Sequence, residues 1–190
     1  MEKVMFLSAI PSQPLPGSVR QNLYPLPREQ WRDHDHFLAS DARPLLRNHA
    51  SLKKQARQYH GALNHLSNLS YQDRQSDDTR QLLPAIQQHL QSLLRNLHSH
   101  HGFEDSTVFP AIRLKHPRLN AAIDLMEKDH EALDQLLHML HQRAQAAPSS
   151  LISSAILDTA RNQAADLEAL LHGHMQNEEE ILVPCYLIYG

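Results

Sequence analysis

Apolar residues recur at three- and four-residue steps along most of the chain, the spacing that lines one face of an α-helix. The pattern predicts four long helices, over about Asp41–Leu69, Thr79–Phe109, Leu119–Ala146 and Leu151–Leu182. Asp41 is expected to cap the first helix, Pro110 to end or kink the second, and Pro184 to end the fourth. Long helices joined by short connections are typical of antiparallel neighbours. The sequence therefore predicts an all-α, up-down-up-down four-helix bundle over residues 41–190.

Residues 1–40 have a different pattern, because prolines interrupt them repeatedly. A long helix is excluded there by Pro11, Pro14, Pro16, Pro25 and Pro27. We expect an extended N-terminal arm with a short helix around Arg28–Leu38. Trp31, Phe37 and Leu38 form its main apolar cluster, which predicts that this part packs over the bundle.

Composition narrows the class of protein. Aromatic residues make up 5% of the chain and only five glycines occur, which favours helix over sheet. The net charge of −3 gives no basic surface for a nucleic acid. Cys185 is the single cysteine, so no intrachain disulfide forms. The apolar stretch Val4–Ile10 is too short to span a membrane and lacks a signal cleavage site, so we expect a cytoplasmic protein without a membrane or nucleic-acid partner.

The chain contains 15 histidines scattered along its expected helices, which points to a metal site. The second and fourth expected helices repeat one motif, in which His100 and Glu104 correspond to His174 and Glu178 when the prolines that follow are aligned. The first and third helices match more loosely, around His49 and His130. The chain is therefore interpreted as a duplicated helical hairpin.

A histidine and a glutamate four residues apart lie one above the other on a helix and can reach one metal or two adjacent metals. Glu104 and His130 both lie about 17 Å from the turn between the second and third helices, at roughly 1.5 Å per residue. Imidazole with carboxylate suits iron, manganese or zinc. The predicted metal ligands are His49, His100, Glu104, His130, His174 and Glu178.

Other residues compete for these roles. His101 with Asp105 is the rival pair to His100 with Glu104, shifted by one position, and the repeat favours the latter pair. Asp105 and Glu179 are expected to lie on the outer face, in solvent. The alternative to a metal site is a set of buried histidines held by hydrogen bonds alone. Burying four imidazoles and two carboxylates without metal is costly, however.

Two other classes of metalloprotein fit less well. A ferritin-like site needs Glu-x-x-His on two helices, and the motif occurs once at a suitable place, from Glu127 to His130. The Cys-x-x-Cys-His motif that attaches a c-type haem is absent.

The segment from about Pro44 to Pro184 resembles the hemerythrin-like, HHE cation-binding family. The resemblance rests on His-His-Gly-Phe-Glu-Asp at residues 100–105 with Val-Phe-Pro at 108–110, on His130 after Asp129, and on His174 before Glu178. It does not cover residues 1–40. It implies a non-haem centre of two iron ions, bridged by the two glutamates and a solvent oxygen.

The same resemblance implies that the protein binds or senses dioxygen or nitric oxide. The alternatives are a redox enzyme acting on peroxide or nitric oxide, an iron donor for iron–sulfur cluster repair, and a metal-supported interaction module. Whether the protein is an enzyme, and its oligomeric state, stay open.

Oxygen-carrying members of the family have His-x-x-x-His on the third helix, where this chain has His130 and Asp134. The fifth imidazole is then missing, and we expect an open metal position, or one taken by Asp134, and a short-lived oxygen adduct. The alternatives are that Asp134 only hydrogen-bonds a ligand, or that another histidine replaces the missing one.

Overall fold

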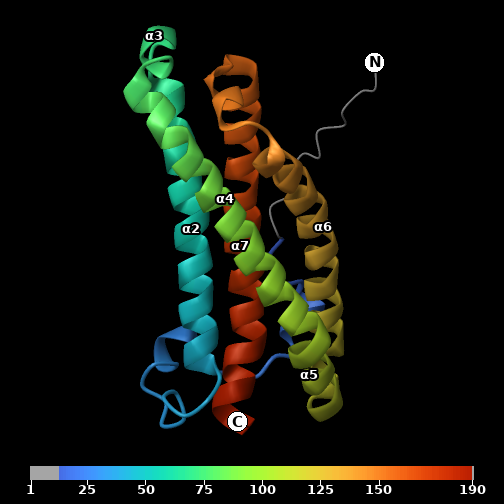
Figure 1. Cartoon of the computed structure of the whole chain (residues 1–190). Coiled ribbons are helices and arrows are strands. Elements are labelled where there is room, and N and C mark those ends of the chain that lie inside the picture. Colours follow the sequence, from blue (N-terminus) through green and yellow to red (C-terminus); the bar gives the residue numbers. More distant parts are fainter. Residues whose placement is uncertain (1–12, 190) are drawn as a thin grey trace.

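The computed structural model describes residues 13–189, which form helices and turns without a strand. Figure 1 shows the long helices lying side by side along the molecule. They are α2 (Ala42–Asn68), α4 (Asp77–Phe103), α6 (Asn120–Gln145) and α7 (Ser154–Tyr189). Helix α7 packs on α2 and α6, and α4 packs on the same two helices. The predicted all-α class is confirmed.

Short helical elements connect the long ones. They are α1 (Gly17–Arg20), η1 (Arg28–Gln30), α3 (Tyr71–Arg74), the π-helical turn η2 (Glu104–Val108), α5 (Phe109–Lys115), η3 (Pro117–Leu119) and η4 (Pro148–Ile152). Ser76 caps α4, because its side-chain oxygen accepts a hydrogen bond from the backbone N–H of Thr79. Asp41 occupies the N-cap position of α2, but its side chain makes no capping hydrogen bond.

The two prolines that were expected to end helices do not end them. Pro110 lies in the first turn of α5, where its missing N–H costs nothing, and the helical path continues to Lys115. Pro184 lies inside α7, which continues to Tyr189. The predicted end at Pro184 was therefore wrong, and the extra turns add the surface on which the N-terminal segment packs.

Apolar side chains form a large cluster and smaller ones, and a polar layer separates them. On α6, Met126 belongs to a smaller cluster and Leu133 to the large one, and the buried His130 lies between them. On α7, Met175 and Ile181 flank Glu178 in the same way. Polar groups in this layer are therefore removed from water on both sides.

The described part of the N-terminal segment packs against the bundle. Trp31 is 3% exposed and lies with Ala42, Val183 and Leu187. Its indole N–H donates to the carbonyl of Leu26 at 2.9 Å. The expected helix at residues 28–38 is only the 3₁₀ turn η1 followed by further turns. Residues 1–12 of the expected arm lie outside the described residues.

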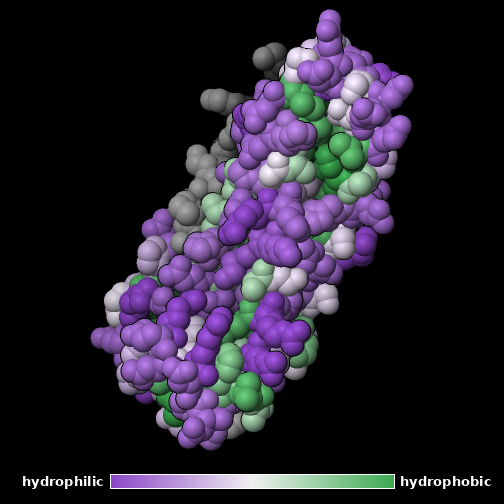
Figure 2. Space-filling model, turned by 90° about the vertical axis from the view of Figure 1, so that its left-hand side faces the viewer, coloured by the Kyte–Doolittle hydropathy of each residue, from purple (hydrophilic) through white to green (hydrophobic). Residues whose placement is uncertain are grey.

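Leu38 does not take part in this packing, since it is 74% exposed, and that part of the prediction was wrong. The visible long face of the molecule is mostly hydrophilic, with separate apolar areas toward both ends (Figure 2). Within residues 13–189, no helix combines the length and apolar character needed to cross a membrane.

We expect Trp31→Ala to lower the free energy of unfolding by about 3–5 kcal/mol, because it removes a fully buried indole. The matched control is Leu38→Ala, which removes an exposed apolar side chain and should change stability by less than about 0.5 kcal/mol. Urea unfolding followed by circular dichroism measures both. Equal effects of the two substitutions would show that the N-terminal segment does not stabilise the bundle.

Candidate metal centre

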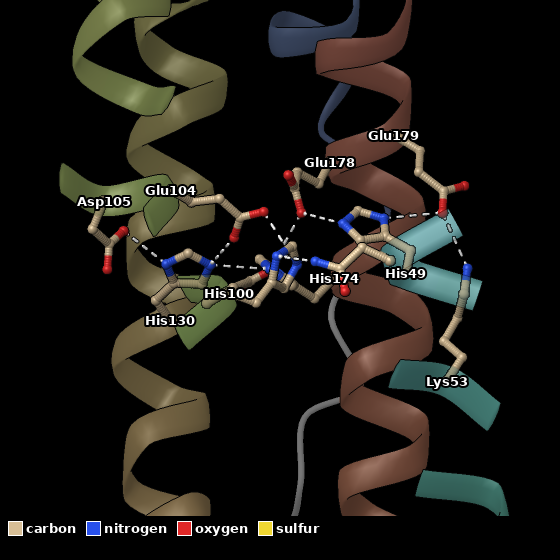
Figure 3. Close-up of polar contacts among 11 residues, drawn as sticks. His49, Lys53, His100, Glu104, Asp105, His130, His174, Glu178 and Glu179 are labelled. Carbon is tan, nitrogen blue, oxygen red and sulfur yellow. Dashed lines mark hydrogen bonds and ion pairs between the residues drawn. The ribbon is translucent and has the colours of Figure 1, made fainter. Parts of the chain in front are cut away.

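The structure brings the six residues predicted as metal ligands into one layer of the bundle interior (Figure 3). His49 comes from α2, His100 from α4, His130 from α6, and His174 with Glu178 from α7; Glu104 is the first residue of η2. None of the six is more than 6% exposed. The two pairs spaced by four residues meet as expected: His100 Nε2 lies 3.1 Å from Glu104 Oε1, and His174 Nε2 lies 3.8 Å from Glu178 Oε2.

The ligand atoms form two neighbouring groups, each compact enough for one ion. The first group is His49, His100, Glu104 and Glu178, and the second is His101, His130 and His174. Within each group the candidate ligand atoms lie within 4.8 Å of one another. Metal–nitrogen and metal–oxygen bonds of about 2.1 Å separate ligand atoms by roughly 3 to 4 Å, so the spacing suits a metal ion in each group.

Both carboxylates face the two groups at once. Glu104 directs Oε1 toward His100 in the first group and Oε2 toward His130 in the second, at 3.5 Å. Glu178 Oε2 lies 3.2 Å from His49 Nε2 and 3.8 Å from His174 Nε2. Each glutamate is thus placed between two sets of imidazoles, as a bridging carboxylate would be.

Polar side chains outside the layer lie beside the outer nitrogens of the four predicted histidine ligands. His49 Nδ1 contacts Glu179 Oε1 at 3.1 Å, and His130 Nδ1 contacts Asp105 Oδ1 at 2.8 Å. His174 Nδ1 lies 3.5 Å from Asp129 Oδ2. A carboxylate that accepts from Nδ1–H leaves the lone pair of Nε2 directed inward, which orients a metal-binding imidazole.

His100 follows the same arrangement with an amide in place of a carboxylate. The side-chain amide of Asn48 lies 3.2 Å from His100 Nδ1. An amide can present either its oxygen or its nitrogen, and the oxygen accepts from Nδ1–H. With that orientation, His100 Nε2 also faces the layer with a free lone pair.

Asp105 and Glu179 were predicted to be solvated outer-face residues, and that prediction was wrong for Glu179. Glu179 is 2% exposed and binds Lys53 Nζ at 3.1 Å and Arg28 at 2.7 Å, besides His49. Asp105 is partly exposed but contacts His130. Acids directly after a ligand glutamate are 100° further around the helix, so they reach the neighbouring helices instead of solvent. The doubled acids at positions 104–105 and 178–179 were the signal that could have shown this.

The π-helical turn explains how Glu104 and Asp105 both serve the centre. It begins at Glu104, where the regular hydrogen-bonding of α4 gives way to the wider π turn. Such turns occur often at functional sites, because they change the direction of side chains within one helix. This turn could not be predicted from the sequence, since its residues are compatible with a regular helix.

Two further residues differ from expectation. His101, considered as a rival of His100, is buried together with it, so both point into the bundle. His101 stacks on His130 with ring centroids 4.3 Å apart. Asp134, predicted as a possible ligand in place of a fifth imidazole, is exposed on α6 and belongs to neither group. Direct ligation by Asp134 is therefore not supported by this geometry.

Burial and mutual repulsion set the protonation of the centre. Burial, reinforced by the neighbouring Glu178 carboxylate, raises the pKa of Glu104 far above its usual range. Burial also acts against ionisation of Glu178, but His49 outweighs it and lowers the pKa of Glu178. Burial lowers the pKa of His100 to about 4 and that of His101 to about 2. Both rings are therefore neutral near pH 7, as a metal ligand must be.

The protein alone leaves this layer unsatisfied, and a metal pair fits what is left over. In the described part of the chain, Nε2 of His49 and of His100 and the carboxylate oxygens of Glu104 and Glu178 have no hydrogen-bond partner, although they lie close to one another. Buried polar atoms in native proteins nearly always have a partner. Hard carboxylate oxygens combined with imidazole nitrogens, without thiolate, suit iron, manganese or zinc. The residues present therefore fit two such cations.

A pocket of about 510 Å³ reaches the first group from the surface. Its walls come from α2, η2, α5 and the end of α7, and its inner end is formed by His100 and Glu104. Cys185 and Tyr186 also line it. The pocket therefore gives a ligand a route to the ion of the first group.

Comparison with known proteins agrees with this donor set. The family model described as "Hemerythrin HHE cation binding domain" matches residues 40–186. No curated protein and no solved structure matches the chain. The matched range contains all the residues of both groups.

We expect Glu104→Gln to stabilise the metal-free protein at high pH. The pKa of Glu104 is raised in the folded state, so the folded chain holds a proton that the unfolded chain releases above about pH 4.3. Stability of the metal-free wild type should then fall as the pH rises above that value. Glutamine cannot ionise, so the variant should gain at least about 1.4 kcal/mol over the wild type at pH 8, the equivalent of one pKa unit.

The measurement is urea unfolding of chelator-treated protein at pH 5 and pH 8. Glu131→Gln, on the exposed side of α6, is the matched control and should follow the wild type. If Glu104→Gln shows the same loss between the two pH values as the wild type, Glu104 is not the protonated group.

We expect Glu179→Gln to weaken metal binding about 10- to 100-fold, because the charged acceptor that orients His49 is lost. Glu180→Gln changes the adjacent carboxylate, which pairs with Arg20 at 2.9 Å and does not contact the layer. It should leave the affinity unchanged. Competition with a chromophoric chelator measures both, and equal affinities for the two variants would contradict an orienting role for Glu179.

Proposed function

The chain belongs to the hemerythrin HHE cation-binding family, and we propose that its long helices form an up-down-up-down bundle that holds two iron ions and binds or senses a small diatomic ligand. Dioxygen and nitric oxide are the ligands we expect. The observation that carries the proposal is the placement of Glu104 and Glu178, each of which faces both groups of imidazoles.

Two carboxylates set between two groups of imidazoles favour a pair of divalent or trivalent cations over a single one. Burial beside the Glu178 carboxylate raises the pKa of Glu104, and bound cations would favour the ionised form of both carboxylates. A pair of bound iron ions would supply reversible electron donation to a diatomic ligand. The protein would contribute the fixed positions of its donors, through the partners of each Nδ1.

The surroundings of the layer limit what reaches the ions. Leucine, methionine and phenylalanine side chains of the apolar clusters close it above and below, and the pocket beside His100 and Glu104 opens it to one side. A smaller pocket, of about 270 Å³, is lined by His174 of the second group. A small ligand could therefore approach an ion in either group.

A redox enzyme acting on peroxide or nitric oxide is the second candidate, and the pocket favours it. Its volume of about 510 Å³ exceeds the space of a diatomic molecule, since one water occupies about 30 Å³. Cys185 and Tyr186, two side chains capable of oxidation, lie in the same pocket. Peroxide reduction would draw its two electrons from a reductant outside the chain.

The test is to purify the protein without oxygen, measure its iron content, and record visible spectra before and after adding dioxygen or nitric oxide. We expect two iron ions per chain and a spectral change that reverses when the gas is removed. The melting temperature should fall after chelation, because metal binding is coupled to folding. Continuous consumption of peroxide with an added reductant would favour the enzyme. One ion per chain, or spectra that ignore both gases, would contradict the proposal.

A further inference from the structure

We propose that His101 is a fifth imidazole ligand, which binds the metal ion of the second group together with His130 and His174. The inference rests on the proposed metal pair and concerns how the two positions differ. It is drawn from the surroundings of His101, which differ from those of any other buried histidine in the described part of the chain.

His101 is buried without a polar partner. It is 4% exposed, and neither Nδ1 nor Nε2 hydrogen-bonds to any residue that the structure describes. The four predicted histidine ligands each have Nδ1 beside Glu179, Asn48, Asp105 or Asp129. An imidazole with two unpaired nitrogens is costly to bury unless something else binds one of them. A metal ion among these rings supplies that partner.

Adjacent residues on α4 can serve the two groups because they point in different directions. Successive residues of an α-helix are 100° apart. His100 turns toward α2, where its ring lies 5.0 Å from that of His49. His101 turns toward α6 and α7, where its ring lies 4.3 Å from His130 and 5.6 Å from His174. The candidate ligand atoms of these three histidines lie within 4.8 Å of one another.

The group with fewer imidazoles contains the carboxylates. Glu104 and Glu178 both fall in the first group with two imidazoles, and the second group consists of three imidazoles. Without His101, the second ion would have only His130 and His174 besides the shared carboxylates. His101 would supply a third imidazole to that ion. The two ions would therefore differ in their ligands, with two imidazoles and two carboxylates in the first group and three imidazoles in the second.

The alternative is that His101 is only an aromatic ring stacked on His130. His101→Phe separates the two roles, because phenylalanine keeps a ring of similar size for stacking and has no nitrogen to bind metal. His98→Phe is the matched control, since His98 is exposed on the same helix three residues earlier. Iron is loaded without oxygen, and its content and rate of release to a chelator are measured for the wild type and both variants.

We expect the wild type and His98→Phe to hold two iron ions per chain. His101→Phe should hold about one, or release the second at least tenfold faster. Two ions in His101→Phe with unchanged release would overturn the inference and leave the proposed function standing. Fewer than two ions in the wild type would contradict the proposed function itself.

A second measurement uses the unaltered chain, in case His101→Phe does not fold. Nitrogen-15 NMR of the histidine-labelled protein, with and without zinc as a diamagnetic probe, counts the rings whose nitrogen shifts on metal binding. We expect five of the 15 histidines to respond as bound ligands. Four bound rings, with the two-ion stoichiometry intact, would overturn the inference.

Discussion

The structure depends on the burial of two carboxylates in one layer with five imidazoles. Glu104 and Glu178 are 1% and 0% exposed, and apolar clusters close the layer on both sides. Charged groups in such a place need a compensating charge, or they take up protons. Four helices must therefore be held at fixed distances around this point, and the long apolar faces of α2, α4, α6 and α7 do so. The apolar packing sets the positions of the donors, and cations offset the cost of gathering them there.

The orienting partners extend the centre beyond the helices that carry it. Glu179 joins His49 to Lys53 on α2 and to Arg28 in the N-terminal segment. The Arg28 guanidinium also lies over the ring of Trp31, 4.7 Å from its centroid. A change in the packing of this segment would therefore alter the position of His49 through two contacts, Arg28 with Glu179 and Glu179 with His49. The segment is joined to the site chemically as well as by apolar packing.

Much of the fold and site could be predicted because both follow from local spacing. The helical faces are visible as three- and four-residue steps, and the pairs His100–Glu104 and His174–Glu178 as four-residue steps repeated in the two halves. What could not be predicted depends on contacts between helices. The burial of His101 and Glu179 is decided by which neighbour each side chain meets. Pro110 and Pro184 lie within helical segments that packing against their neighbours stabilises. The end of the fourth helix could therefore not be predicted from its proline alone.

The π-helical turn at Glu104–Val108 has a consequence for the rotational phase of the helix that contains it. A regular α-helix turns about 100° per residue, so one extra residue in a turn displaces everything after it by about that angle. The faces of α4 and α5 are therefore not in register with each other. His100 and His101 can face the interior while Phe109, 0% exposed and stacked near His130, still faces it five residues after Glu104. Deleting a single residue within this turn would bring the helix back into phase, and would send either the imidazoles or the phenylalanine toward water.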